Sequence, residues 1–492
     1  MKYRRFGAIL GLAAMLSGCG GGGGSLSNGG GGGGGVTPTP TPTPTAVAGC
    51  SLRERQDWAA AQLNEWYLFP ETLPTALNPS SYSTVDAYID ALTATARSQR
   101  RDRYFTYLTS IAEENAYYNA GASAGFGFRL GADTPSRRIF IIESFEGAPA
   151  LAAGIDRGTE ILAIGTSVAN LRTVNAIIAA EGTAGVTAAL GPDTTGTTRV
   201  LRVNDAARGT RDVTVAKADF ELTPVSARYG AKVINDGGRK VGYVNLRTFI
   251  NTADPALRSA FANFRAQGIT EVIVDLRYNG GGLISIAELM GDLLGGNRST
   301  SEVFDYITFR PEKSSENSNH NFAPQPQSVS PTRLAFIGTG GTASASELVI
   351  NAFTPFFHNR SALIGTNTYG KPVGQIALDR AACDDRLRVI AFATQNSARQ
   401  GAYFDGVAPF MEASCQANDD ITHQLGDPLE ASTRSALDFL AGRSCSVITA
   451  SAPQSSSARS ASSATTPLPA APRELLTPDR PSTPQREVPG LF

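Results

Sequence analysis

Ser344 is the residue of this 492-residue chain whose type and surroundings best suit covalent chemistry. It lies in GTGGTASASELVINAF (338–353), where we expect an apolar strand to pass through a turn of small residues into a helix. A hydroxyl at such a turn is exposed, near the positive end of the helix dipole and beside unhindered backbone N–H groups. These features suit a serine nucleophile with its oxyanion hole. The spacing of Ser344 and Glu347 also suits an ordinary capping box, so the fragment alone leaves both interpretations open.

A serine nucleophile needs a base, and the histidines of the chain do not offer one. His320, His358 and His423 lie in no recognisable catalytic context. A lysine whose pKa is lowered by burial is the other common solution, because its neutral amine accepts the hydroxyl proton. Lys371 in NTYGKPVGQ (367–375) follows an expected strand, and Gln375 is placed to hold its amine. The alternative interpretation of Lys371 is a surface lysine at a strand end.

The elements that would position these residues alternate between strands and helices from 223 to 445. Strands are predicted at 240–249, 270–282, 333–340 and 362–370, and helices at 254–268, 283–294 and 344–353. In the first helix Leu257, Phe261 and Phe264 share one face. A βαβ order of this kind predicts an α/β core.

Three segments of this core resemble, in order, the motifs of the C-terminal processing peptidases, also called tail-specific proteases. They are DLRYNGGG (275–282), GTASASE (341–347) and GKPVGQ (370–375). The resemblance implies a crotonase-like fold and the following site: Ser344 as nucleophile, Lys371 as general base, Gln375 as its orienting partner, and the N–H groups of Ala345 and of Gly281 or Gly282, preferably Gly282, as oxyanion hole.

Two features depart from the pattern of that family. The separation of Ser344 and Lys371 is 27 residues, slightly wider than expected, whereas Ser346 would give 25. The motif position favours Ser344, and the extra length is then assigned to the loop at 354–360. Pro372 also stands where the family usually has glycine, which biases Lys371 to an extended backbone.

Residues 121–222 show the pattern of short strands rich in β-branched residues, separated by turns that contain glycine. This segment resembles a PDZ domain. In such domains a Gly-x-Gly-Phe loop presents N–H groups to a terminal carboxylate, and the adjoining strand edge pairs with the peptide. The matching residues are Gly125, Phe126, Gly127 and Phe128. The alternative is a simple bulge in a β-rich spacer.

The two ends of the chain differ in composition from the rest. Residues 1–19 have a basic start, a short apolar run and the ending LSGC, which resembles the lipobox of bacterial lipoproteins with Cys19 as the lipidated residue. The same resemblance implies, from Gly20 after the cysteine, attachment to the outer membrane, facing the periplasm. Residues 20–49 form a Gly and Thr-Pro linker, residues 50–120 a small helical segment, and residues 446–492 a disordered tail.

Charge and cysteine content exclude several other functions. The chain has 43 Lys and Arg against 44 Asp and Glu, so composition predicts no nucleic-acid binding. No CxxC or HExxH spacing occurs, and we expect neither metal nor cofactor. Beyond Cys19, four cysteines in an oxidising compartment predict two disulfides. Three pairings are possible, and we favour Cys50–Cys445 with Cys383–Cys415.

These features predict a lipid-anchored serine endopeptidase that cleaves protein substrates near free C-termini, with the PDZ segment assisting recognition. The main alternative is a catalytically inactive PDZ adaptor that binds peptides at the cell envelope. A purely structural lipoprotein would explain the linker and the tail but not the grouping of serine, lysine and glutamine.

Overall fold

The computed structural model describes residues 48–449 and 473–492. The predicted signal peptide, lipidated Cys19 and almost all of the linker therefore lie outside the described residues. Over the described ranges, no helix has both the length and the apolar character needed to cross a membrane.

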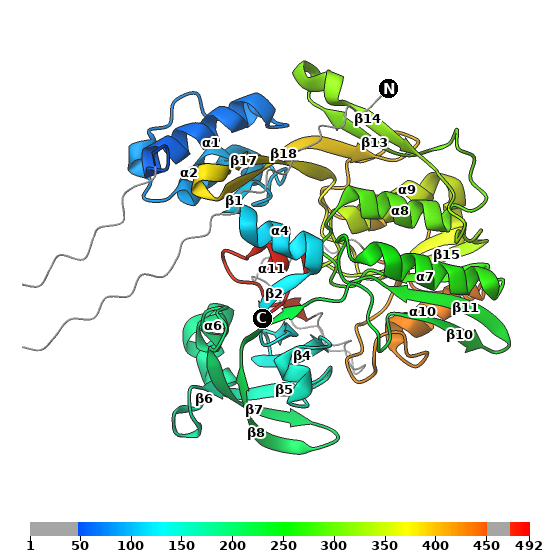
Figure 1. The fold of residues 1–492 in the computed structure, drawn as a ribbon. Helices are drawn as coiled ribbons and strands as arrows, with labels where there is room; N and C mark the ends of the chain where they lie inside the picture. The colour runs from blue at the N-terminus through cyan, green and yellow to red at the C-terminus, as the bar shows by residue number, and fades with distance from the viewer. Residues whose placement is uncertain (1–47, 450–472) are drawn as a thin grey trace, which may run out of the picture. The chain divides into compact units, whose positions relative to one another are not determined.

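A six-stranded sheet forms the centre of the α/β core (Figure 1). Its strands follow the order β10-β11-β12-β15-β16-β19, and all neighbours are parallel except the β10–β11 pair. The strands are β10 (Ala231–Asp236), β11 (Arg239–Asn245), β12 (Glu271–Asp275), β15 (Arg333–Gly338), β16 (Ser361–Gly365) and β19 (Ser414–Gln416). The carboxyl ends of β12 and β15 are neighbours in register, with Asp275 opposite Ile337, so the segments that follow them lie side by side.

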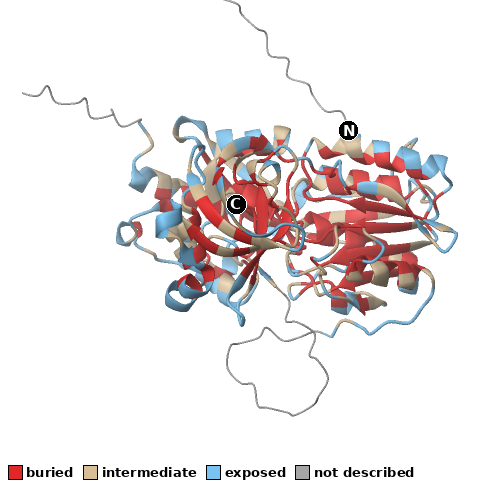
Figure 2. Cartoon of the chain, turned by 90° about the horizontal axis from the view of Figure 1, so that it is seen from below, coloured by how far each residue is buried: buried red, intermediate tan, exposed pale blue. Residues whose placement is uncertain are grey.

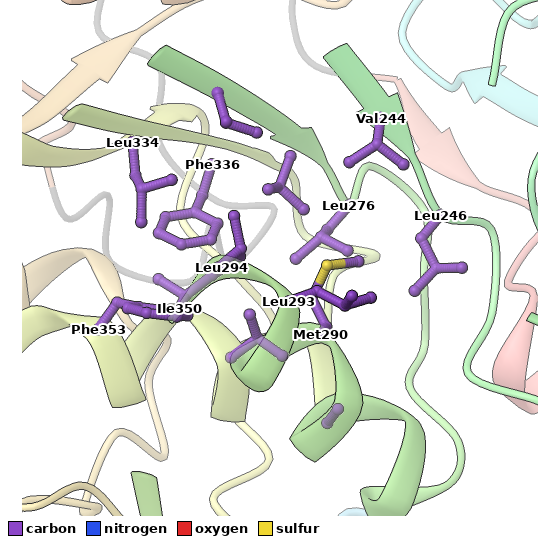
Figure 3. Close-up of a cluster of buried hydrophobic side chains, with 14 of the residues drawn as sticks. Val244, Leu246, Leu276, Met290, Leu293, Leu294, Leu334, Phe336, Ile350 and Phe353 are labelled. Carbon is purple, nitrogen blue, oxygen red and sulfur yellow. The ribbon is translucent and has the colours of Figure 1, made fainter. Parts of the chain in front are cut away.

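Helices cover both faces of this sheet. They are α7 (Ala253–Ala266), α8 (Ile284–Leu294), α9 (Ala345–Phe357) and α10 (Ala431–Leu440). Successive strand residues point to opposite faces. Leu334 and Phe336 pack against α8 and α9, as Figure 3 shows, whereas Ala335 packs with residues of α10. Burial on both faces explains why these strands are almost uniformly apolar.

The predicted core elements are confirmed, with most strands shorter than expected and α9 extended to Phe357. The strand expected at 362–370 stops at Gly365, so Lys371 lies in a connection that leads into the next strand. The helix expected at 254–268 is α7, and Leu257, Phe261 and Phe264 are buried on its inner face. The helix expected from 344 begins at Ala345, with Ser344 as its N-cap.

A second, antiparallel sheet carries the N-terminal segment. It contains β1 (Tyr107–Ser110), β13 (Val303–Phe309), β14 (Ser318–Asn321), β17 (Val373–Arg380) and β18 (Asp385–Gln395). The predicted short helices are present as α1 (Leu52–Trp66), α2 (Val85–Leu92), α3 (Ala94–Ser98) and α4 (Ile111–Ala120). Leu63 and Phe105 from this segment share a hydrophobic cluster with Val373 and Leu387, which fixes the segment on the β17–β18 hairpin.

The β-rich segment has a sheet and core of its own. Its elements are β2 (Ala122–Gly125), β3 (Phe128–Asp133), β4 (Arg138–Ser144), α5 (Pro149–Ala152), β5 (Glu160–Gly165), β6 (Arg172–Thr173), α6 (Val174–Leu190), β7 (Thr198–Asp205), β8 (Gly209–Ala216) and β9 (Ala218–Glu221). The sheet runs in the order β20-β3-β4-β5-β7-β8, with β6 beside β5, and β2 pairs separately with β9. Its edge strand, β20, comes from the far end of the chain.

The last twenty residues are ordered, contrary to the prediction of a disordered tail over 446–492. Residues 473–492 contain β20 (Glu474–Leu475) and α11 (Thr483–Glu487). The side chains of Leu476, Val488 and Phe492 are buried. Figure 2 colours each described residue by how far it is buried. The prediction failed because the Ser- and Ala-rich composition of residues 450–472 masks the few apolar residues that follow.

Two disulfides are present, but the favoured pairing is wrong. Cys50 is bonded to Cys383 and Cys415 to Cys445, with Cα–Cα distances of 5.5 and 5.4 Å. Cys383 lies at the tip of the β17–β18 hairpin, beside the start of α1. Sequence spacing carries no information on this approach of segments 333 residues apart.

Candidate active site

Ser344 occupies a strained position between β15 and α9. Its backbone has φ 55° and ψ −116°, a region that non-glycine residues rarely adopt. The sharp turn leaves Ser344 partly accessible, whereas its neighbours Ala343 and Ala345 are buried. As the N-cap of a 13-residue helix, Ser344 also lies at the positive end of the helix dipole.

Ser346, the alternative nucleophile, faces the protein interior. Its side chain is fully buried, and its Oγ donates a hydrogen bond to the carbonyl oxygen of Asn279 at 3.1 Å. The same carbonyl accepts a hydrogen bond from Ala343 N at 2.9 Å. Ser346 therefore ties the turn around Ser344, here called the serine turn, to residues 279–282, here called the NGGG loop. Ser344 instead faces a cavity.

Lys371 and Gln375 meet beside this cavity. Lys371 Nζ donates a hydrogen bond to Gln375 Oε1 at 2.9 Å, and Gln375 Nε2 donates to the carbonyl oxygen of Phe105. The ammonium also lies 5.1 Å from the centre of the Phe105 ring. Burial lowers the pKa of the Lys371 amine, which favours its neutral form. Among the described residues Lys371 Nζ makes no hydrogen bond to Ser344.

The cavity that joins these residues has a volume of about 220 Å³. It is lined by residues from the NGGG loop, the start of α9, the β17–β18 hairpin and the C-terminal segment. They include Gly282, Ser344, Ala345, Lys371, Gln375 and Glu487. The structure thus brings the predicted serine, lysine and glutamine to one small cavity.

Gly281 and Gly282 adopt backbone conformations that favour glycine, with φ of 123° and 132°. A Cβ atom on Gly281 would lie 2.7 Å from Ser344 Cβ, so the loop is packed directly against the serine. The Gly281 N–H donates to Asn279 Oδ1 at 2.9 Å and is already occupied. Within the described part of the chain the Gly282 N–H has no such partner, and Gly282 and Ala345 both line the cavity.

Glu347 is a site residue whose role the sequence did not reveal. Its buried carboxylate accepts hydrogen bonds from the backbone N–H groups of Ser344 (3.0 Å), Lys371 (2.7 Å) and Gly370 (2.6 Å), and from Thr368 Oγ1 (2.5 Å). Burial raises the pKa of Glu347, and these donors oppose that rise. The capping-box spacing was visible in the sequence, but the contacts to residues 368–371 were not.

The NGGG loop is itself held by buried ion pairs. Arg277 is fully buried and pairs with Asp275 at 2.7 Å and with Glu430 at 2.8 Å. Asn279 Nδ2 donates to the carbonyl oxygen of Leu246 at 2.8 Å. The polar residues of DLRYNGGG therefore fix the loop rather than line the cavity.

The loop of residues 125–128, here called the carboxylate loop, presents backbone groups rather than side chains. The rings of Phe126 and Phe128 are buried in the core of the β-rich segment and stack with their centres 5.4 Å apart. Gly127 has φ 75°, and a Cβ atom there would lie 2.0 Å from Ala148 Cβ. The N–H groups of Gly127 and Phe128 point to the carbonyl oxygen of Phe492, at 2.9 and 3.3 Å.

The histidines lie away from the cavity. His320 contacts Asp292, His358 contacts Glu412 and His423 contacts Asp420. No group of three or more His, Cys, Asp or Glu side chains suited to a metal ion occurs in the part of the chain that the structure describes.

Comparisons with known proteins show which family and which proteins the chain is similar to. Residues 240–409 match Peptidase family S41. The chain is 26% identical over 268 residues to "C-terminal processing peptidase, chloroplastic" of Tetradesmus obliquus, covering 53% of this chain and 54% of the relative. It is 28% identical over 257 residues to "Carboxyl-terminal-processing protease" of Picosynechococcus sp., covering 51% and 55%. The chain thus spans about half the length of these relatives.

A solved structure shows the same fold over a larger part of the chain. The putative S41 protease of Bacteroides fragilis superposes with a TM-score of 0.61 at 21% identity, covering 78% of this chain and 97% of that protein. The similarity extends well beyond residues 240–409, so the α/β architecture holds for most of the described chain.

Proposed function

Starting from the match of residues 240–409 to Peptidase family S41, we propose that this protein is a serine endopeptidase with a Ser344–Lys371 dyad. The observation that carries the proposal is the convergence of Ser344, Lys371 and Gln375 on one cavity, next to the N–H groups of Gly282 and Ala345. An inactive adaptor would have no chemical need for this arrangement.

In the proposed mechanism neutral Lys371 takes the Ser344 Oγ proton as the oxygen attacks the scissile carbonyl. The N–H groups of Gly282 and Ala345 stabilise the resulting oxyanion. Lys371 then passes the proton to the leaving amine, and water hydrolyses the acyl-enzyme by the reverse use of the same base. Because Lys371 Nζ donates its hydrogen bond to Gln375 rather than to Ser344, the amine must shift toward Ser344 before the first step.

We further propose that substrates are proteins cleaved near a free C-terminus, which the β-rich segment captures as a PDZ module. The carboxylate loop supports this, because its backbone N–H groups donate hydrogen bonds to a main-chain oxygen, as they would to a terminal carboxylate, and the adjoining edge of β3 pairs with an added strand. The names of the related processing proteases point to the same class of substrate. Lipidation of Cys19 and attachment to the outer membrane complete the proposal, on the strength of the LSGC ending.

A serine-directed covalent probe tests the proposal most directly. We expect the purified protein to be labelled at Ser344, and Ser344→Ala to remove the label. Ser299→Ala, a change at an exposed serine, is the matched control and should be labelled like the unmodified protein. Equal labelling of Ser344→Ala would contradict the nucleophile assignment, and no labelling of any variant would favour the adaptor.

A further inference from the structure

The C-terminal segment, residues 473–492, runs along β3 twice. Its first run is antiparallel, with Glu474 opposite Ala132 and Leu475 opposite Gly131. Its second run covers the other end of the same strand, where Leu130 N donates to Gly490 O at 2.9 Å and Phe492 N donates to Phe128 O at 3.0 Å. This is the main-chain pairing by which a peptide adds a strand to a sheet edge.

Phe492 lies in the carboxylate loop. The oxygen of Phe492 accepts hydrogen bonds from Gly127 N and Phe128 N. The Phe492 side chain is only 2% exposed and belongs to the hydrophobic core of the β-rich segment. Gly125 allows this approach, because a Cβ atom there would lie 2.7 Å from the Phe492 carbonyl carbon. The loop therefore holds the main-chain oxygen of Phe492, and the neighbouring core holds its large apolar side chain.

Between its two runs the C-terminal segment reaches the catalytic cavity. The carbonyl oxygen of Glu487 accepts a hydrogen bond from Gly280 N at 2.9 Å, and Glu487 lines the cavity together with Ser344 and Lys371. The Glu487 side chain is fixed by Tyr118 OH at 3.1 Å. Next to it, Val488 is completely buried, so this part of the segment is anchored and not merely nearby.

The register of the segment at the cavity is not that of a substrate about to be cleaved. In the described residues no carbonyl of segment 473–492 is hydrogen-bonded to Gly282 N or Ala345 N, the two N–H groups assigned to the oxyanion hole. The contact falls instead on Gly280, where a Cβ atom would lie 2.2 Å from Arg486 O. The segment covers the cavity without presenting a peptide bond to it.

We propose that residues 473–492 are an intramolecular ligand that fills the carboxylate loop and covers the catalytic cavity, and that a protein ending in a bulky apolar residue must displace them. The proposal rests on the proposed peptidase and PDZ roles, and it adds a resting state and a preference for the last residue of the substrate. Because the ligand is part of the same chain, it competes at a high effective concentration.

A binding experiment that needs no catalysis tests the displacement. The Ser344→Ala protein is titrated with a fluorescent TPQREVPGLF peptide, the sequence of residues 483–492, with a free or amidated C-terminus. We expect the added change Phe492→Asp, which places a charge in an apolar pocket, to strengthen binding of the free peptide at least about tenfold, since a tenfold change corresponds to only about 1.4 kcal/mol. Thr477→Asp, at an exposed position of the same segment, should leave binding unchanged. Equal affinity of all three proteins would overturn the proposal.

A second variant guards against misfolding of Phe492→Asp. Phe492→Ala removes most of the buried apolar side chain without adding a charge, so it should also strengthen peptide binding. With serine restored, both changes should speed hydrolysis of a reporter peptide that ends in phenylalanine. Stronger binding without hydrolysis by any variant would support the intramolecular ligand and refute the peptidase. Hydrolysis that neither change accelerates would refute the ligand alone.

Discussion

Lys371 is the residue on which the proposed chemistry depends most. An ordinary lysine is almost wholly protonated at neutral pH and cannot act as a base. Here burial lowers the pKa of the amine, and Arg486 and Arg388 act in the same direction, whereas Glu487 and Asp102 raise it. The segment that covers the cavity thus contributes charges of both signs to the environment of Lys371.

The pH dependence of turnover follows from this shift. Only neutral Lys371 accepts the serine proton, so kcat/KM should rise with pH through the pKa of Lys371 and level off above it. The midpoint should lie below the ordinary lysine pKa of about 10.4. Glu487→Gln removes a charge that raises the pKa of Lys371, so it should move the midpoint to lower pH. A flat profile from pH 5 to 10 would contradict the lysine base.

Substitutions at the dyad separate its members. Lys371→Ala should lower kcat by about 10²- to 10⁴-fold, the range typical of general acid–base catalysis. Ser344→Ala removes the nucleophile itself and should lower kcat at least as much. Lys371→Arg should be equally inactive because a guanidinium keeps its proton. Gln375→Ala should lower kcat less, since Gln375 only orients the amine. His320→Ala, His358→Ala and His423→Ala should retain activity, as measured by hydrolysis of a reporter peptide.

Ser346 provides the check on this assignment. Its buried hydroxyl supports the NGGG loop, so Ser346→Ala should reduce turnover without abolishing it. If Ser346→Ala removed all activity while Ser344→Ala remained active, the nucleophile would be Ser346.

Glu347 should matter for both stability and turnover. Its carboxylate accepts four hydrogen bonds, whereas the amide of Glu347→Gln has one acceptor oxygen and an NH₂ group that faces donors. Each buried donor left without a partner costs about 1–3 kcal/mol. We expect a lower melting temperature and a lower kcat with little change in KM, measured by calorimetry and by reporter hydrolysis. Unchanged kcat would mean that the hydrogen bonds to the Glu347 carboxylate do not position Ser344 and Lys371.

At the scale of single elements, the carboxylate loop contains two glycines with different roles. Gly127 has a positive φ and no room for a side chain beside Ala148, so its replacement distorts the loop itself. Gly125 has an ordinary φ, and the atoms nearest to a Cβ atom there would be the carbonyl group of Phe492 and, at 3.7 Å, the neighbouring Gly127 N. Gly125 is therefore the better position at which to test carboxylate recognition.

Gly125→Ala should reduce cleavage of peptides with a free C-terminus more than cleavage of amidated peptides. The physical reason is that the new Cβ atom would lie 2.7 Å from the position that the carbonyl carbon of Phe492 occupies in the loop. Gly127→Ala should instead reduce both alike, with a lower melting temperature. If Gly125→Ala affected free and amidated peptides equally, the loop would be structural.

At the scale of the whole molecule, distant parts of the chain converge on the site. Phe105 from the N-terminal segment holds Gln375, the NGGG loop and the serine turn come from the α/β core, and Glu487 comes from the C-terminal segment. The Cys50–Cys383 disulfide ties the N-terminal segment to the hairpin that carries Gln375. A shift of one of these segments relative to the others would therefore move Ser344 and Lys371 away from Phe105, Gln375 or Glu487.

The proposed lipid anchor is also a property of the whole chain. Cys19→Ser should release soluble protein or leave an unprocessed precursor, because serine lacks the thiol that takes the lipid. Membrane fractionation and mass spectrometry of the mature protein check this. Unchanged fractionation and mass would contradict lipidation of Cys19.

The sequence alone was enough to predict the α/β core and the helices α7, α8 and α9 within it, but not α10. The central strands are apolar throughout, which indicates burial on both faces. Leu257, Phe261 and Phe264 mark the inner face of α7. The convergence of the motifs around Ser344 and Lys371 was also predictable, because each motif follows a strand of the same sheet and the ends of parallel strands meet at one edge.

Only the tertiary structure decided which distant groups complete the site. The disulfide partners, the Phe105 carbonyl, the four donors around Glu347 and the place of Phe492 all depend on contacts between segments far apart in the chain. Such contacts leave no periodic pattern in the sequence. A short apolar segment such as 488–492 is too weak a signal to be predicted as structured by itself. It becomes ordered because the β3 edge supplies hydrogen bonds and the core of the β-rich segment buries Phe492.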